Sequence, residues 1–292
     1  MLENIRLSFR GIWSHKMRSF LTMLGIIIGI AAIIAIVSTI QGTNDQIEKN
    51  LIGSGSNNVK VTLQKDGYDI DLSYDSVPAG ITEVSDSTLD QIKDIDHVES
   101  ASLYKSRQNY NDVYYLNTIL SGGTVLGIDS GYFDTCGYTI MKGRGFSQND
   151  YDKSKKVALI DEKAQKALFQ GESAIGKTIE IKGEPFSVVG IVTEKDSYEL
   201  VINSIEDYYT YSNDSSAGNI FVPESVWPVI YRYDEPQNLI LKTDSADNMA
   251  AAGKAAQDIL NSSMASSDGS TEYKAQDLLE QAKQIQQLSQ ST

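Results

Sequence analysis

The chain has 292 residues, a length that fits one large or two modest folded domains, and its formal net charge is −14. Four of the 25 basic residues but only one of the 39 acidic residues precede residue 25, so the remainder carries a net charge of −17. Such an acidic body repels phosphates and argues against nucleic acid as a partner. The single cysteine, Cys136, excludes an intrachain disulfide, and we interpret it as a small buried or half-buried residue.

An apolar segment near the N-terminus is long enough to cross a membrane. No charged side chain lies between Ser19 and Asn44, and a helix over residues 20–40 would span roughly 30 Å, the thickness of the hydrocarbon core. The run is too long for a cleaved signal peptide, and no A-x-A cleavage pattern follows it. We therefore predict one uncleaved transmembrane helix at residues 20–40, surrounded by the lipid bilayer.

The charges on either side of this segment predict its orientation. Arg10, Lys16 and Arg18 lie before it, whereas Asp45 is the first charged residue after it. By the positive-inside rule, the N-terminus lies in the cytoplasm and the residues after about 42 lie outside the plasma membrane.

Residues 1–19 form the predicted cytoplasmic flank. Apolar side chains recur there at roughly helical spacing: Leu2, Ile5, Phe9, Ile12 and Trp13. We interpret the flank as an amphipathic segment on the inner leaflet, while simple interfacial anchoring by Trp13 and the basic residues stays open.

Gly25 and Gly29 are the candidate site residues of the predicted transmembrane helix. Their spacing matches the small-xxx-small pattern, which lets two membrane helices approach closely. Such pairs are common in apolar segments, so the pattern supports helix packing without proving it.

The residues after 40 alternate between strand and helix patterns, which predicts an α+β fold. Predicted strands and helices follow one another in this order: a strand at Asn58–Leu63, a helix at Val84–Ile95, a strand at His97–Leu103, and later a strand at Asn238–Leu241 and a helix at Asp244–Leu260. Two βαβ-like units that far apart indicate one subdomain interrupted by an insertion.

These patterns give the predicted domain boundaries. The interrupted α+β subdomain takes residues 41–128 and 237–271, and the mainly-β insertion takes residues 129–236. Within the insertion, strands are predicted around Lys156–Ile160, Thr178–Ile181 and Phe186–Val192, with a helix near Glu162–Phe169. Residues 272–292 are predicted to form an amphipathic stalk helix, because Leu278, Ala282, Ile285 and Leu288 share one helical stripe.

One short motif, Gly171–Thr178, fits the phosphate-binding P-loop pattern letter for letter. A P-loop needs a strand before it and a helix after it, so that backbone amides cradle the phosphates. Here a helical pattern precedes the glycine and a strand pattern follows it. We therefore interpret Gly176 and Lys177 as a turn that leads into a strand.

Catalytic and metal-binding patterns are weak. His97 is the only histidine after the predicted membrane helix and lies at a helix-to-strand junction, so a solvated turn residue is a better interpretation than a triad member. The three carboxylates of Asp66, Asp69 and Asp71 lack the calcium-loop spacing. We predict no enzyme activity, no cofactor and no metal site.

Longer blocks of sequence resemble a known family. Residues 15–32, HKMRSFLTMLGIIIGIAA, closely resemble the first transmembrane segment of the macrolide-exporter (MacB-like) family of ABC permeases. From Val125 onward, four blocks resemble successive parts of its extracytoplasmic domain: VLGIDSGYF, MKGRGF with Asp150, KVALIDEKAQKALF and IGKTIEIKGEPFSVVGIV. They follow the expected order up to residue 192.

The resemblance implies an architecture and a mechanism. Family members have one transmembrane helix, an outer domain of two subdomains, and three further transmembrane helices. The interrupted subdomain here resembles the ferredoxin-like porter subdomain, and the insertion resembles the second subdomain. The permease is a homodimer driven by a cytoplasmic ATPase, here a separate subunit, with a membrane-fusion (adaptor) protein as a further partner. Its movements expel peptide-like, antibiotic or other amphipathic compounds.

The chain departs from this pattern because the last three transmembrane helices are missing, and we favour a truncated sequence over a natural fragment. Two other functions stay open. One is a mechanical regulator of a cell-wall hydrolase, like the related cell-division (FtsX-like) permeases. The other is a membrane-anchored binding or sensor module.

Overall fold

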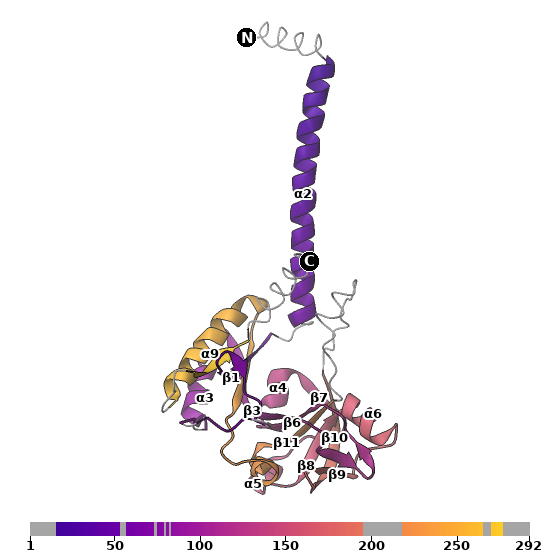
Figure 1. The fold of residues 1–292 in the computed structure, drawn as a ribbon, viewed down its shortest axis with the longest axis vertical. Helices are drawn as coiled ribbons and strands as arrows, with labels where there is room; N and C mark the ends of the chain where they lie inside the picture. Colours follow the sequence, from indigo (N-terminus) through magenta and orange to yellow (C-terminus); the bar gives the residue numbers. More distant parts are fainter. Residues whose placement is uncertain are drawn as a thin grey trace. The chain divides into compact units, whose positions relative to one another are not determined.

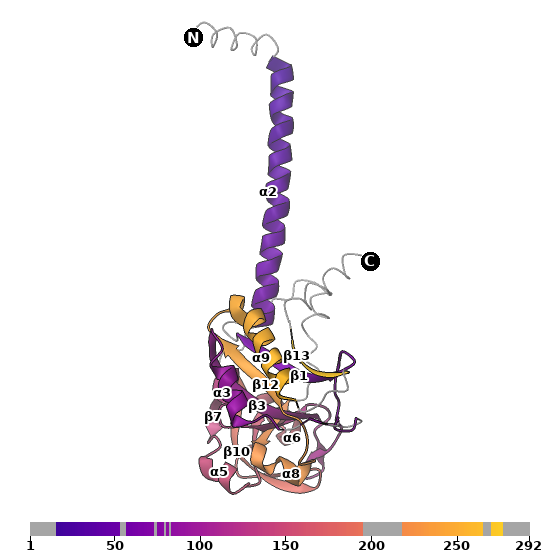
Figure 2. The ribbon, with the colours of Figure 1, turned by 90° about the vertical axis from the view of Figure 1, so that its left-hand side faces the viewer.

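A computed structural model describes residues 16–52, 57–72, 75–78, 80–81, 83–194, 218–264 and 270–276 (Figures 1 and 2). The chain divides into two units, Met1–Lys49 and Asn50–Thr292. Most of the amphipathic segment predicted at residues 1–19 lies outside the described residues.

Helix α2 (Lys16–Ile52) forms most of the first unit and contains the predicted membrane segment. Its stretch Phe20–Thr39 has a mean hydropathy of 2.9, and among the described residues it is the one helix long and apolar enough to cross a membrane. The hydroxyls of Thr22 and Thr39 donate to carbonyls one turn earlier, at 2.8 and 2.9 Å. Polar groups satisfied within the helix suit a lipid environment, where water is absent.

The second unit is built on one hydrogen-bonded set of 13 strands. The order along the main path is β13-β1-β12-β3-β6-β11-β8-β10-β9-β4-β5, with β2 beside β1 and β7 beside β10. The strands are β1 (Asn58–Lys65), β2 (Tyr68–Asp69), β3 (Val98–Gln108), β4 (Val113–Tyr115), β5 (Thr118–Ile119), β6 (Thr124–Ile128), β7 (Tyr138–Gly143), β8 (Val157–Asp161), β9 (Thr178–Ile181), β10 (Glu184–Glu194), β11 (Asn219–Pro223), β12 (Asn238–Thr243) and β13 (Thr271–Ala275).

Short helices cover this sheet. They are α3 (Asp86–Lys93), α4 (Tyr132–Cys136), α5 (Gln148–Asp152), α6 (Glu162–Phe169), α8 (Trp227–Ile230) and α9 (Met249–Ser263), with 3-10 turns η1 (Glu224–Val226) and η2 (Ala246–Asn248). The α3 helix begins where predicted because the Ser85 hydroxyl caps it by accepting from the Thr88 amide at 3.2 Å.

Strand β3 is shared between two parts of the sheet. Its residues 98–104 pair with β12, and its residues 104–108 pair with β6. Tyr104 alone is registered on both sides, opposite Asn238 and Ile128. We call β1, β2, β12, β13, residues 98–103 of β3, α3 and α9 the first lobe, and β4 to β11 with α4, α5, α6 and α8 the second lobe.

Side chains on the two faces of the sheet pack in different ways. On one face, the first lobe has its own apolar cluster beneath α3 and α9, which includes Leu103, Leu241 and Ala256. The second lobe has a separate cluster on that face beneath α6, which includes Ile160 and Leu168. On the other face, a single cluster runs across both lobes, from Ile240 through Tyr104 and Ile128 to Phe221, with Tyr132 of α4 packed in it.

Most predicted elements are confirmed. Helix α6 and strands β8, β9 and β10 lie where the insertion patterns placed them, and β3 begins at Val98 but extends to Gln108. The hairpin residues Val113 and Leu120 pack in the second-lobe cluster. This hairpin therefore packs with residues of the predicted insertion, while β6 pairs with both β3 and β11, and the boundary at residue 128 stays a prediction.

The stalk helix predicted from residue 272 is wrong for its first residues, because Thr271–Ala275 form strand β13. Thr271 and Tyr273 are buried while Glu272 and Lys274 are exposed, which is the alternation of an edge strand paired with β1. The rest of that prediction, residues 277–292, lies outside the described residues.

Asp150 is a buried carboxylate that holds the turn before α5. It accepts hydrogen bonds from the Ser147 amide at 2.8 Å, Arg144 Nη1 at 2.6 Å and Lys155 Nζ at 3.2 Å. Burial alone would raise the pKa of this carboxyl, but these donors hold the pKa well below its usual range. A lowered folded-state pKa stabilises the fold above the unfolded-state pKa of about 3.9, and this contribution is lost as the pH falls below that value.

We predict that Asp150→Asn lowers the free energy of unfolding at pH 7 by about 2–3 kcal/mol, because it removes a buried charge whose basic partners are part-exposed. The variant should also lose less stability than wild type between pH 4 and pH 2. Urea denaturation at several pH values measures both effects. The control is Asp152→Asn, an exposed carboxylate that accepts from Gln148 at 2.9 Å. Equal stability of Asp150→Asn and wild type would contradict this role.

Candidate functional site

Two places in the structure carry features beyond ordinary packing: one face of α2, and the junction of the two lobes at β3. On α2, a methyl group built on Gly25 or Gly29 meets no atom within 4 Å beyond the adjoining backbone of its own helix. The apolar side chains around these glycines are exposed as well, Leu21 at 62% and Ile28 at 60%. Exposure is the same on the other faces of the Phe20–Thr39 stretch, so packing through Gly25 and Gly29 stays a prediction.

At the lobe junction, β3 presents charged side chains where an apolar core is expected. The side chains of Lys105 and Arg107 lie on the same face as Leu103, because alternate residues of a strand share a face. They are only 3% and 9% exposed. Buried charges of this kind require partners, since an unpaired buried charge is strongly unfavourable.

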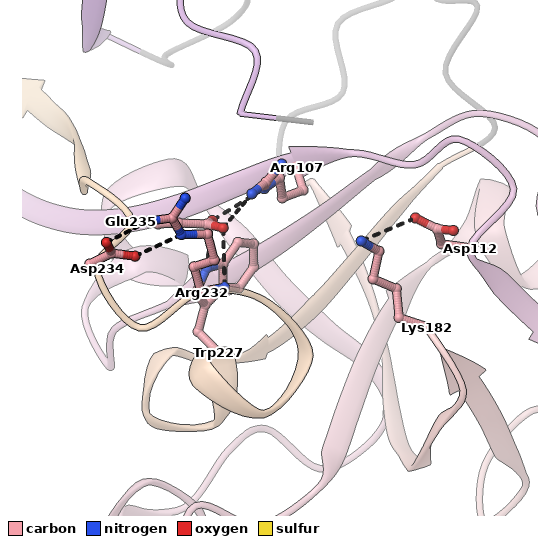
Figure 3. Close-up of polar contacts among 7 residues, drawn as sticks. All are labelled: Arg107, Asp112, Lys182, Trp227, Arg232, Asp234 and Glu235. Atoms are coloured by element: carbon pink, nitrogen blue, oxygen red, sulfur yellow. Dashed lines mark hydrogen bonds and ion pairs between the residues drawn. The ribbon is translucent and has the colours of Figure 1, made fainter. Parts of the chain in front are cut away.

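Arg107 is paired with Glu235, which lies in the segment returning from the second lobe to the first (Figure 3). The guanidinium donates from Nε to Glu235 Oε2 at 3.2 Å and from Nη2 to Oε1. The same carboxylate accepts from Trp227 Nε1 at 2.9 Å and from the Arg232 amide at 3.2 Å. Glu235, 1% exposed, is thereby fully used as an acceptor.

Aromatic rings complete the packing around this ion pair. The Trp227 ring is 4.5 Å from that of Tyr231, and the Arg107 guanidinium lies 5.3 Å from the Tyr231 ring centre. Trp227 lies directly on Gly127 of β6, where a built Cβ would come within 2.5 Å of the indole. Only glycine at this position lets the indole rest on the strand.

Lys105 extends the charged junction toward α3. Its ammonium donates to Glu83 at 3.0 Å and lies 3.9 Å from Glu224 of η1. Gln237 donates to Glu224 and accepts from the Val84 amide at 2.9 Å, so one side chain links both lobes. Burial raises the pKa of the Glu224 carboxyl. We call Lys105, Arg107, Glu224, Glu235 and Gln237 the charged seam.

Asp129, at the end of β6, connects β3 to the second lobe through hydrogen bonds. Its carboxylate accepts from the Ser102 hydroxyl, from the Leu103 amide at 2.8 Å and from the Gly131 amide at 2.9 Å. Its carbonyl accepts from the Tyr151 hydroxyl at 3.1 Å. This residue therefore joins the end of β6 to the first-lobe part of β3.

Comparison with known proteins identifies the family. Residues 19–259 match the family described as the MacB-like periplasmic core domain. The chain belongs to this family.

Relatives of this chain are described as ABC permeases. The uncharacterized ABC transporter permease YvrN of Bacillus subtilis (strain 168) is 36% identical over 297 residues, which cover 100% of this chain and 69% of YvrN. YknZ of the same organism, also an uncharacterized ABC transporter permease, is 28% identical over 92% of this chain and 62% of YknZ. The macrolide export ATP-binding/permease protein MacB of Aggregatibacter actinomycetemcomitans is 31% identical over 73% of this chain and 32% of MacB.

Solved structures support the fold. The periplasmic region of MacB from Actinobacillus actinomycetemcomitans superposes with a TM-score of 0.54 at 21% identity, covering 84% of this chain and 98% of that one. The extracellular domain of YknZ gives a TM-score of 0.50 at 23% identity, covering 76% and 100%. The predicted α+β class and the resemblance to MacB-like permeases are both confirmed, and the second unit is an ABC permease-type extracellular domain.

The sequence motifs that we did not assign to catalysis or ligand binding take part in turns and local hydrogen bonds. The P-loop-like stretch lies between α6 and β9, and the Gly176 amide donates to Val188 at 2.8 Å, which confirms a turn leading into a strand. His97 is exposed at the start of β3, 2.8 Å from Asp244. Asp69 accepts from Thr62 and Gln64 within its own hairpin. In the described part of the chain, no group of three His, Cys, Asp or Glu residues could hold a metal.

Sequence patterns missed the charged seam. Arg107 and Glu235 are 128 residues apart, and no local rule pairs them. The usable signal was the position of Lys105 and Arg107, which continue the inward alternation of Ala101 and Leu103 without being apolar.

We predict that Arg107→Met lowers the free energy of unfolding by about 3–5 kcal/mol, because it leaves Glu235 buried without its cation. The double variant Arg107→Met/Glu235→Gln should lose less than about 2 kcal/mol, since glutamine removes the charge but still accepts from Trp227.

Denaturation followed by tryptophan fluorescence measures both values. Lys156→Met is the control, because its ion pair with Glu184 at 2.6 Å is part-exposed and should contribute at most about 1 kcal/mol. A double variant as unstable as the single one would show that the charge pairing is not what Arg107 supplies.

Proposed function

We propose that this chain supplies the first transmembrane helix and the outer domain of an ABC permease, driven by a separate cytoplasmic ATPase subunit. The observation that carries the proposal is the match of the whole chain to YvrN, an ABC transporter permease. In MacB, by its description, the ATP-binding and permease parts belong to one protein. In the described residues, the P-loop look-alike Gly171–Thr178 is a turn between α6 and β9 and not a phosphate-binding loop.

In the proposed topology, the N-terminus lies in the cytoplasm, α2 crosses the plasma membrane, and the lobes lie outside. The four basic residues before the apolar stretch support this orientation, since the first basic residue after it is Lys49. The permease acts as a homodimer, and the open face at Gly25 and Gly29 is the proposed helix contact.

The proposed task is to expel peptide-like, antibiotic or other amphipathic compounds, together with an adaptor protein outside the membrane. ATP hydrolysis moves the transmembrane helices, and the outer lobes pass that movement on. Support comes from the relatives described as macrolide export proteins. Movement rather than chemistry is the proposed contribution of the outer domain.

The experiment is deletion of the gene that encodes this chain, followed by complementation. Deletion should increase sensitivity to amphipathic peptide antibiotics and macrolides, and the wild-type gene should restore resistance. Complementation with Gly25→Ile/Gly29→Ile should fail, because two added side chains keep membrane helices apart. Complementation with Ala31→Ile should succeed, because Ala31 lies on another face of α2.

Unchanged sensitivity in the deletion strain would contradict the export proposal. If the deletion strain instead forms chains or changes its rate of autolysis, the regulator of a cell-wall hydrolase becomes the better function.

A further inference from the structure

The two faces of the sheet resist bending to different degrees at the lobe junction. On the α4 face, one apolar cluster crosses the junction without interruption, from Ile240 to Phe221. On the opposite face, the apolar clusters of the two lobes are separate, and the charged seam lies between them. Separating an apolar cluster exposes its surface to water, which is strongly unfavourable. Separating paired charges costs much less, because water solvates both partners.

The backbone shows the same division. Residues 98–104 of β3 pair with β12 and residues 104–108 pair with β6, so the two ladders overlap only at Tyr104. A change of twist at Tyr104 therefore reorients one lobe against the other and leaves the remaining registered pairs of each ladder in place. Strand twist varies readily among proteins, so such a change is a soft deformation.

A second connection crosses the junction beside β3. The chain returns from α8 to β12 through residues 231–237, and Glu235 of this segment is held by Arg107 of β3. Gln237, in the same segment, contacts both Glu224 of η1 and the amide of Val84 before α3. The seam thus ties together the two places where the chain passes between lobes.

We propose that the two lobes move as units about β3 at Tyr104, opening at the charged seam and pivoting on the apolar cluster beneath α4. The Lys105–Glu83 ion pair and the Gln237–Glu224 hydrogen bond cross between the lobes and hold the closed state, whereas the Arg107–Glu235 pair fastens the returning segment to the second lobe. This movement is a property of the outer domain itself and does not depend on the proposed export function.

The distance between α3 and α6 reports this movement directly. Both helices cover the face that carries the seam, one over each lobe (Figure 1). Gln91 and Ala167 are exposed residues of these helices and can be replaced by cysteine for spin labelling. The native Cys136 can stay, because burial raises the pKa of its thiol to about 12 and leaves it unreactive near neutral pH.

The experiment is double electron–electron resonance on the full chain in lipid nanodiscs. We expect Lys105→Met to lengthen or broaden the Gln91→Cys/Ala167→Cys distance by more than about 2 Å, the scale of a domain rearrangement, because it removes the ion pair with Glu83. Gln237→Leu removes the contact with Glu224 independently and should act in the same direction, which keeps the test valid if one variant folds poorly.

The matched control pair is Lys153→Cys/Ala167→Cys, whose positions both lie in the second lobe and are exposed. Its distance should not change in any seam variant. Two results would overturn the proposal: an unchanged α3–α6 distance in both single variants, or equal broadening of the control pair, which would indicate general loosening of the fold.

Discussion

Strand β3 joins the two parts of the sheet with one backbone, and the rest of the second unit depends on how it does so. Its first residues belong to the ladder with β12 and its last residues to the ladder with β6, with Tyr104 as the shared register position. Because β12 and β6 pair with different stretches of β3, both lobes can be built around this one strand. It also forces the inward-facing side chains past Leu103 to lie between two cores rather than inside either one.

The charges at the junction follow from that position. Lys105 and Arg107 are buried, so each needs a carboxylate: Arg107 has Glu235 in the segment that returns between the lobes, and Lys105 has Glu83 before α3 and Glu224 of η1. Replacing buried ion pairs by apolar residues is often neutral or stabilising, which means that stability alone does not explain them. Water can solvate the charged seam when it opens, whereas it cannot favourably solvate the apolar cluster beneath α4. This difference explains why the charges lie on only one face of the sheet.

Local patterns in the sequence predicted those elements whose determinants are local. Helix α3 has a Ser85 cap and an apolar stripe, and α6 is capped by Asp161, so both were predictable from a few neighbouring residues. Strand β13 was misread because only five residues carry its alternation, next to a segment with helical spacing. The Arg107–Glu235 pair depends on the tertiary register of β3 and the loop before β12, which no local window contains. Gly25 and Gly29 were found by pattern, and their partner is still a proposal.

Native-state hydrogen exchange along β3 tests the shared-strand account most directly. If β3 serves two separately packed lobes, the amides of residues 98–103 should open with the same free energy as those of β12 and α9. The amides of residues 105–108 should open with a different free energy, shared with β6 and β8. A single opening free energy along the whole strand, equal to that of both lobes, would contradict the account.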